Sequence, residues 1–252
     1  MLISREFALP DDLLGRKDAV MIEPANVLLS GIVGSTAYGL AGPGSDIDRL
    51  GLFAAPTTAF HGLTFPEDSV VSKKPDATFH EARRYANLAL SGNPTVSELM
   101  WLPEDLYETR HPLGDELIGI RTAFLSAKRV RDSYLGYATQ QFKRLEARGD
   151  GSFSADTRKR TAKHARHLLR LCVHGLDLYT TGHLRIRLDD PQRFLDFGER
   201  VAAGDVDMAS RTMADYESRF DTTPTPLPNE PDRAAVEAWL RRVRALFFDA
   251  AG

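Results

Sequence analysis

The chain has 252 residues, 42% of them hydrophobic, so it can bury a sizeable core as one large domain or two smaller ones. Its formal net charge of −3, from 35 acidic and 32 basic residues, excludes a general attraction to phosphate backbones and leaves nucleic-acid contacts to local clusters. A single cysteine, no signal-peptide pattern at the N-terminus and no apolar run of membrane-spanning length predict a cytoplasmic protein without a membrane span.

The first hundred residues have the pattern of a small sheet interrupted by short helices. Strands are expected at Val27–Ser30, Asp46–Phe53, Val70–Lys73 and Asp76–Phe79. A short helix at Ser35–Leu40 lies within a glycine-rich loop between the first two strands, and a longer helix is expected over His80–Ser91.

Beyond Trp101 the sequence favours helices. Amphipathic segments run over Asp115–Arg148, Ala155–Thr181, Pro191–Ala203, Met208–Phe220 and Asp232–Ala250. The four prolines between Thr222 and Pro231 preclude a continuous helix there. We therefore expect an α+β protein, with a small mixed-sheet catalytic domain at residues 1–108 and a mainly α-helical domain at residues 109–252.

Two carboxylates stand two residues apart on the second predicted strand. The side chains of Asp46 and Asp48 should leave the same face of that strand, about 6.6 Å apart along it, while Ile47 points into a core. Close carboxylates raise each other's pKa, and a bound Mg²⁺ relieves the repulsion. In two-metal sites, ions roughly 3.5–4 Å apart activate an attacking hydroxyl and neutralise the leaving group.

A cradle for phosphate is predicted just before these carboxylates. Gly34 lets the backbone approach a phosphate, and the amide groups and hydroxyl of Ser35 can donate hydrogen bonds to it. Gly-Ser and Asp-x-Asp are each common, but the two together, eleven residues apart in this order, form a much rarer pattern.

The residues of this pattern resemble a known signature. GSTAYGL at 34–40 and SDIDRLG at 45–51 are similar to the nucleotidyltransferase motif of the DNA polymerase β superfamily, and more narrowly to the RNA repair pathway DNA polymerase beta family. Later stretches resemble that family too, at 92–101, 163–171, 179–182 and 227–232. The resemblance implies a palm-like catalytic domain, Mg²⁺ dependence with Mn²⁺ as the alternative, and a nucleoside triphosphate (NTP) as donor.

The resemblance also implies a third catalytic carboxylate on a later strand, usually the general base for the attacking hydroxyl. Asp76 is our candidate, because it begins a β-like stretch just before a helix. Glu81 is the alternative, although within a predicted helix it should face solvent or pair with Arg84. The expected catalytic and metal-binding set is therefore Asp46, Asp48 and Asp76.

A basic helix follows in the second half of the chain. Lys163, His167 and Arg170 share one face of it, within a run of cations that has no acidic residue between Arg158 and Arg170. We expect these three side chains to hold triphosphate or an RNA backbone. Zinc binding by the histidines is not expected, because no further ligand lies nearby in sequence. A weaker basic candidate comprises Lys128, Arg129 and Arg131.

Four other residues have both a functional and a structural interpretation. Arg49 should form a structural ion pair, since it points away from the face that carries Asp48. Tyr38 suits base stacking and packing on the sheet equally well. Asn93 should stop a helix, and Glu98 is either a polar anchor for the loop that follows or a surface residue.

These features predict a Mg²⁺-dependent nucleotidyltransferase that moves a nucleoside monophosphate to a hydroxyl and releases pyrophosphate. The acceptor that we expect is an RNA under repair or end modification. One alternative keeps this chemistry with a protein or small molecule as acceptor, as in toxin-modifying and antibiotic-modifying members of the superfamily. The other is an inactive module that senses nucleotides.

Overall fold

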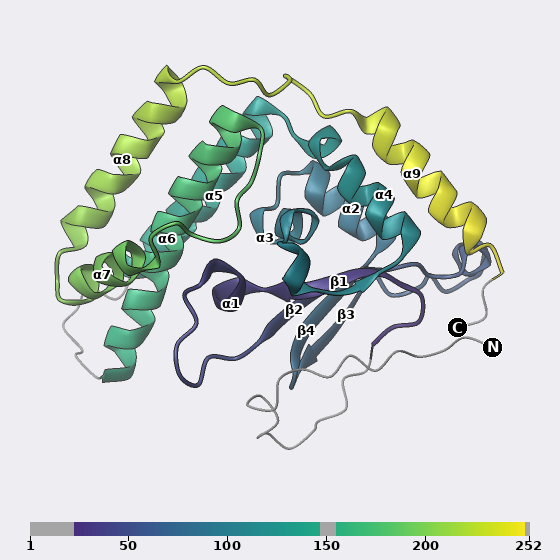
Figure 1. Cartoon of the computed structure of the whole chain (residues 1–252), viewed down its shortest axis with the longest axis horizontal. Coiled ribbons are helices and arrows are strands. Elements are labelled where there is room, and N and C mark those ends of the chain that lie inside the picture. Colours follow the sequence, from purple (N-terminus) through teal and green to yellow (C-terminus); the bar gives the residue numbers. More distant parts are fainter. Residues whose placement is uncertain (1–22, 147–154, 250–252) are drawn as a thin grey trace.

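A computed structural model describes residues 23–146 and 155–249, in which a mixed sheet lies beside a group of long helices (Figure 1). The strands all end before His111, and the long helices follow. The predicted α+β fold, a small mixed sheet followed by a mainly helical region, is therefore confirmed.

Five strands form one sheet in the order β3-β4-β2-β1-β5. They are β1 (Val27–Val33), β2 (Asp48–Phe53), β3 (Ser69–Lys73), β4 (Asp76–Glu81) and β5 (Tyr107–Arg110). The central strand β2 runs antiparallel to β1 and parallel to β4. The end of β1 and the starts of β2 and β4 therefore lie side by side at the same end of the sheet.

Four helices cover the sheet on one side in the described part of the chain (Figure 1). They are α2 (Ala82–Leu90), α3 (Pro94–Glu98), α4 (Pro112–Gly119) and the C-terminal α9 (Arg233–Leu246). Single turns of 3-10 helix lie at η2 (Thr57–His61), η3 (Leu99–Trp101), η4 (Glu104–Leu106) and η5 (Arg121–Phe124). Trp239 of α9 is fully buried, and its indole N–H donates to the carbonyl of Leu113 in α4 at 2.8 Å.

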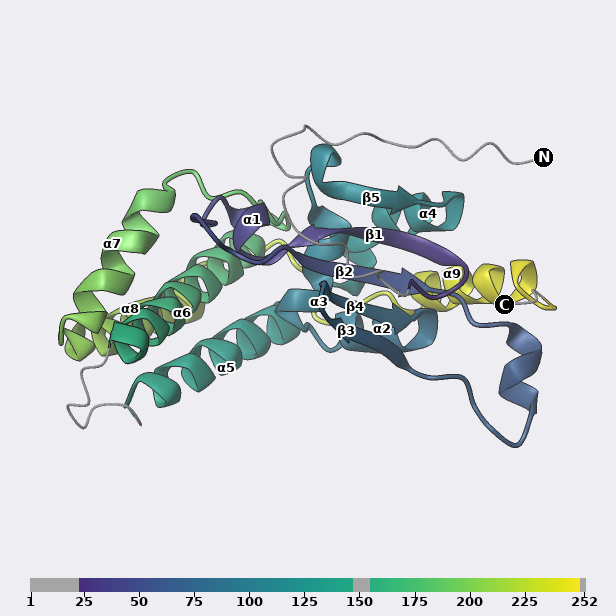
Figure 2. The ribbon, with the colours of Figure 1, turned by 90° about the horizontal axis from the view of Figure 1, so that it is seen from below.

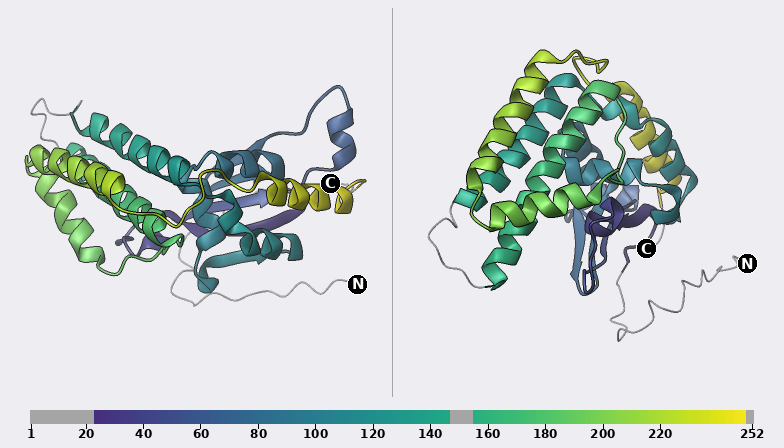
Figure 3. Two further views of the ribbon diagram at one scale, coloured as in Figure 1. Left: turned by 90° about the horizontal axis from the view of Figure 1, so that it is seen from above. Right: turned by 60° about the vertical axis from the view of Figure 1, so that its left-hand side comes forward.

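Four long helices form the second lobe (Figure 3). They are α5 (Ala127–Glu146), α6 (Ala155–Thr181), α7 (Pro191–Ala202) and α8 (Val206–Thr222). The helix α7 packs closely on α6 at Gly198, where a Cβ would lie 2.7 Å from Cγ of Arg166 and 2.8 Å from the carbonyl oxygen of Ala162. The short helix α1 (Gly34–Tyr38) lies at the end of the sheet that faces this lobe (Figure 2).

The predicted strands all form, and three differences from the predicted elements have physical causes. The β5 strand was missed, because four residues at a sheet edge give too short a pattern. His80 and Glu81 belong to β4 and not to the following helix. The expected helix over Asp115–Arg148 is divided into α4, η5 and α5. The segment before α9 hydrogen-bonds to the backbone where η5 ends and α5 begins: the amide of Ala127 donates to the carbonyl of Pro228 and that of Asp232 to the carbonyl of Ala123, each at 2.8 Å.

None of the helices described here is both long and apolar enough to cross a membrane. The division at residue 108 stays a prediction. The helices α4 and α9, which follow that point in sequence, contact each other and the sheet or its covering helices.

Candidate active site

Gly34 stands directly against the carboxylate of Asp48. Val33 at the end of β1 pairs with Asp48 at the start of β2, so the next residue lies beside that side chain. A Cβ on Gly34 would lie 2.3 Å from Oδ2 of Asp48, and its φ of +70° is a conformation that other residues rarely adopt. Only glycine therefore allows the backbone and this carboxylate to approach so closely.

Asp48 and Asp76 begin neighbouring parallel strands. Arg49 pairs with Ala77, so the two aspartates stand side by side one residue earlier. Burial raises the pKa of the Asp48 carboxyl, Asp76 and Asp46 raise it further, and Lys163 opposes them. The structure thus brings together all three predicted carboxylates and one predicted cation.

The position of Asp46 differs from the one expected. The strand begins at Asp48, and Asp46 is an exposed residue of the loop before it, so the two side chains are not fixed by strand alternation. The physical reason is the preceding run of glycine and proline, in which Gly44 has a φ of +80°. This loop brings Asp46 within electrostatic range of Asp48 by another route.

The donors in this cluster suit a hard cation. Carboxylate oxygens are the ligands that Mg²⁺ prefers, and burial together with the neighbouring Asp76 and Asp46 raises the pKa of Asp48, which a divalent ion would counteract. Within residues 23–146 and 155–249, no three acidic, histidine or cysteine side chains already converge on one point as a metal site. The three carboxylates would therefore have to close around an ion.

Glu81 does not fit the role of third carboxylate. It is 1% exposed, and its two oxygens pair with the guanidinium of Arg244 in α9 at 2.7 and 2.9 Å. It also accepts the amide of Arg83 at 2.8 Å at the start of α2. The prediction that it faces solvent or pairs with Arg84 was wrong, because it ends β4 inside the protein. The opposite end of that strand carries Asp76, roughly 16 Å away.

Lys163 and His167 lie on the same helix but in different environments. Lys163 is exposed and near Asp48. His167 is partly buried, and burial together with the charges of Arg170 and other nearby cations lowers its pKa to about 3. Its Nδ1 lies 3.3 Å from Nη2 of Arg170, which can only donate, so the remaining proton of this neutral imidazole is on Nε2.

Arg170 is engaged inside the protein. It is 1% exposed, and its Nη1 donates to Oε1 of Glu98 at 2.6 Å. Burial would lower the pKa of Arg170, but the charges of Tyr38 and Glu98 raise it overall. In this conformation its guanidinium serves an internal ion pair and does not face solvent, where a phosphate would bind.

Tyr38 and Glu98 complete this buried network. The Tyr38 hydroxyl donates to Oε2 of Glu98 at 2.5 Å, and the guanidinium of Arg170 lies 4.1 Å from the centre of the Tyr38 ring. For both residues the structure favours the structural interpretation: Tyr38 packs and Glu98 is the anchor. The network joins α1, α3 and α6, so it holds the Gly34-Ser35 turn against the helical lobe.

Several other candidate residues have structural partners. The predicted ion pair of Arg49 is confirmed, with its Nε 2.9 Å from Oε1 of Glu108. The predicted helix stop at Asn93 is confirmed, because α2 ends just before it and the Asn93 amide donates to the carbonyl of Leu88 at 3.1 Å. Asn93 also begins the next helix, since its side chain accepts the amide of Val96 at 3.1 Å at the start of α3. In the weaker basic candidate, Lys128 pairs with Asp132 and Arg131 with Asp221.

Sequence reasoning missed Arg144. This exposed arginine in the last turn of α5 acts on His167 alongside Lys163, so it belongs to the same cationic cluster. The hydrogen bond that Nδ1 of His164 donates to Oε1 of Gln141, at 2.8 Å, fixes which faces of α5 and α6 meet. The sequence does place Arg144 one helical turn after Gln141, but this indicates a position near His167 only once the packing of α5 on α6 is known.

Comparison with known proteins decides the family. A family model described as the RNA repair pathway DNA polymerase beta family matches residues 16–189, well over half of the chain. The chain belongs to this family. The RNA repair pathway DNA polymerase beta family is one of DNA polymerase β-type nucleotidyltransferases, which supports the same class of enzyme here. No curated protein matches the chain.

Proposed function

We propose that this protein is a Mg²⁺-dependent nucleotidyltransferase that transfers a nucleoside monophosphate from an NTP to a hydroxyl of RNA. The observation that carries the proposal is the cluster of Asp46, Asp48 and Asp76 beside Gly34, with Lys163 close enough to act on Asp48. Phosphoryl transfer requires carboxylates that hold metal and cations that hold phosphate close to one another.

The binding roles follow from charge and position. Asp46, Asp48 and Asp76 would hold Mg²⁺, which when bound neutralises charge on the triphosphate and on the attacking oxygen. Gly34 and Ser35 would cradle the phosphates, with Lys163 as their counter-charge. The neutral His167 would donate a hydrogen bond from Nε2 and add no charge.

The proposed reaction exchanges one P–O bond for another at the α-phosphorus and moves one proton. The oxygen of the acceptor hydroxyl attacks the α-phosphorus, a new P–O ester bond forms, and the bond from the α-phosphorus to the bridging oxygen of the β-phosphate breaks. The hydroxyl proton goes to Asp76, and pyrophosphate leaves toward Lys163. Asp76 suits the base because it stands beside Asp48 at the exposed start of β4.

RNA is the proposed acceptor because of the family and the cations near the site. The description of the family refers to an RNA repair pathway. Lys163 adds positive charge close to Asp48, and Arg144 adds it close to His167 on the same helix as Lys163, so a phosphate backbone that approaches the site would meet cations.

The test is a transfer assay with labelled NTPs and Mg²⁺, run separately with total RNA, total protein and no acceptor. Transfer to RNA that disappears in Asp48→Asn is expected, with a loss of more than about 100-fold in turnover. Asp207→Asn is the matched control, since this exposed carboxylate lies in the first turn of α8, away from the site. Label on protein alone would favour the alternative acceptor, and unchanged turnover in Asp48→Asn would refute the site.

A further inference from the structure

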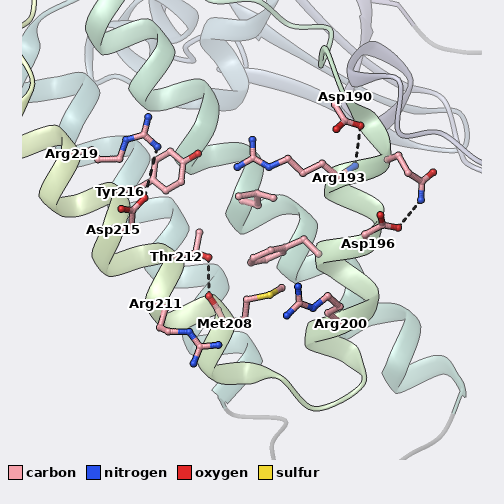
Figure 4. Close-up of a pocket in the computed structure, with 13 residues that line it drawn as sticks. Asp190, Arg193, Asp196, Arg200, Met208, Arg211, Thr212, Asp215, Tyr216 and Arg219 are labelled. Carbon is pink, nitrogen blue, oxygen red and sulfur yellow. Dashed lines mark hydrogen bonds and ion pairs between the residues drawn. The ribbon is translucent and has the colours of Figure 1, made fainter.

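A cavity lies between α6, α7 and α8 (Figure 4), and its lining includes none of the three carboxylates Asp46, Asp48 and Asp76. Its volume is about 730 Å³, within the range of small-molecule sites. Apart from Leu169, its lining residues follow residue 189, where the family match ends. What this cavity binds is therefore a question that the match does not answer.

Four arginines face the cavity, two from each wall (Figure 4). Arg193 and Arg200 come from α7, seven residues and hence two helical turns apart. Arg211 and Arg219 come from α8 at nearly the same spacing. The two rows of guanidinium groups thus face each other along the length of the cavity.

These cations are incompletely neutralised in the part of the chain described. Arg200 and Arg211 share one carboxylate, Asp205, at 3.2 and 3.3 Å. Arg193 has no ion pair within that part of the chain. Arg219 lies 3.8 Å from Asp215 and over the ring of Tyr216. Guanidinium groups with spare donors are the usual partners of phosphate oxygens.

Carboxylates and apolar groups complete the lining. Asp190 accepts the amide of Arg193 at 3.2 Å, and Asp196 accepts the amide group of Gln192 at 2.7 Å. The side chains of Phe197 and Met208 contribute apolar surface. Aspartates would repel a bare polyanion, but they can accept from the amino groups of a base whose phosphate binds arginine.

One end of the cavity adjoins α1. The amide of Leu188, just before α7, donates to the carbonyl of Tyr38 at 3.2 Å. At Gly39 a Cβ would lie 3.6 Å from the ring of Pro191, the first residue of α7. An extended ligand that leaves the cavity at this end would therefore pass close to α1, the helix that carries Ser35.

We propose that the cavity between α7 and α8 binds a nucleotide unit of a single-stranded RNA acceptor, with its phosphates on Arg193, Arg200 and Arg211. This inference rests on the proposed function, which it deepens by giving the acceptor a docking site apart from the NTP. Single-stranded RNA fits because its bases are unpaired and free to meet Asp196 and the apolar floor.

The test compares RNA binding and NTP binding in the same full-length preparations. Fluorescence anisotropy measures a labelled single-stranded RNA across a salt series, and a fluorescent NTP with Mg²⁺ is titrated separately. The variant is Arg193→Ala with Arg211→Ala. Arg241→Ala is the matched control, because this α9 arginine is 78% exposed and paired with Glu237 on the other lobe.

The double variant should lose on the order of 100-fold in RNA affinity, about tenfold for each arginine, and its salt slope should fall by about 1.4. NTP binding should stay as in the wild type, and so should every property of the control. Unchanged RNA affinity, or equal loss of RNA and NTP binding, would overturn the inference. Displacement of the RNA by heparin or by a free mononucleotide as readily as by unlabelled RNA would also overturn it.

The outcomes of these binding and transfer experiments distinguish a failure of the cavity assignment from a failure of the proposed function. If the wild type binds RNA through the cavity but neither binds NTP with Mg²⁺ nor transfers label, the proposed catalysis fails and the cavity assignment stands. If it transfers label to an acceptor other than RNA and binds no RNA, the proposed acceptor and the cavity assignment fail together.

Discussion

Replacing Gly34 with alanine should damage the active site more than it damages the fold. The new Cβ would stand 2.3 Å from Oδ2 of Asp48, whereas ordinary contact begins at 3.4 Å. The backbone cannot relieve this clash cheaply, because Gly34 lies between β1 and α1 and its neighbour Val33 is paired with Asp48. The carboxylate must therefore move by about 1 Å.

Two separate costs follow from this substitution. An alanine at φ +70° loses roughly 1–2 kcal/mol of stability from backbone strain alone. A catalytic group misplaced by about 1 Å costs on the order of 100-fold in turnover, equivalent to about 2.7 kcal/mol of transition-state stabilisation. The loss of activity should therefore exceed what unfolding explains.

Gly182→Ala is the matched control. Gly182 has the same φ of +70°, but a Cβ there would meet only Leu227 at an ordinary 3.7 Å. Urea unfolding should give similar stability losses for both variants, while Mg²⁺-dependent turnover and Mg²⁺ affinity fall in Gly34→Ala alone. Full turnover in Gly34→Ala would refute the assignment of this close contact to the active site, and so would an equal fall in the control.

Three further predictions concern buried or crowded charges. Arg170→Met should cost about 3–5 kcal/mol of unfolding free energy, since it leaves Glu98 buried without its partner; a loss below about 1 kcal/mol in urea titration would contradict the structural role. His167 has its pKa lowered to about 3, so its contribution to stability is complete above the unfolded value of 6.5 and is lost as the pH falls. Lowering the pH from 7.5 to 5.5 should therefore reduce the unfolding free energy of the wild type by about 1.4 kcal/mol through His167. His167→Gln should lack this part of the pH dependence, and a variant with the same pH dependence as the wild type would disprove the prediction. The pKa of Asp48 is raised, so its contribution to stability is complete below the unfolded value of 3.8 and is lost as the pH rises. Metal-free Asp48→Asn should therefore melt higher than the wild type at neutral pH and gain less from Mg²⁺, and a lower melting temperature would argue against crowding.

The parts of the site that are local in sequence could be predicted. Gly34, Ser35 and Asp48 lie within fifteen residues, and the strand-turn-strand pattern around them determines their approach. Asp76 was predicted from its position at the start of a strand, and the parallel pairing of β4 with β2 puts it beside Asp48. For these residues, the pattern of apolar and polar residues along the chain predicts the strands and turns that determine their relative positions.

The role of Arg170 could not be read from the sequence. Within the basic run it looks like Lys163, and only its rotation around α6 separates a buried cation from an exposed one. Its partner Glu98 lies 72 residues earlier, as the last residue of α3, a short helix whose position depends on tertiary packing. Ion pairs between distant segments leave no local pattern, so a charge cluster predicts a basic face but not which of its members face solvent.

The pair between Glu81 and Arg244 also bears on how the chain is made. Glu81 ends a central strand of the sheet, yet its counter-charge arrives 163 residues later, in the last helix. The amides of Thr57 and Thr58 likewise donate to the carbonyls of Phe247 and Phe248. During synthesis the sheet lobe emerges first but acquires these partners last, so a chain stopped before α9 would carry a buried carboxylate with no cation to meet it.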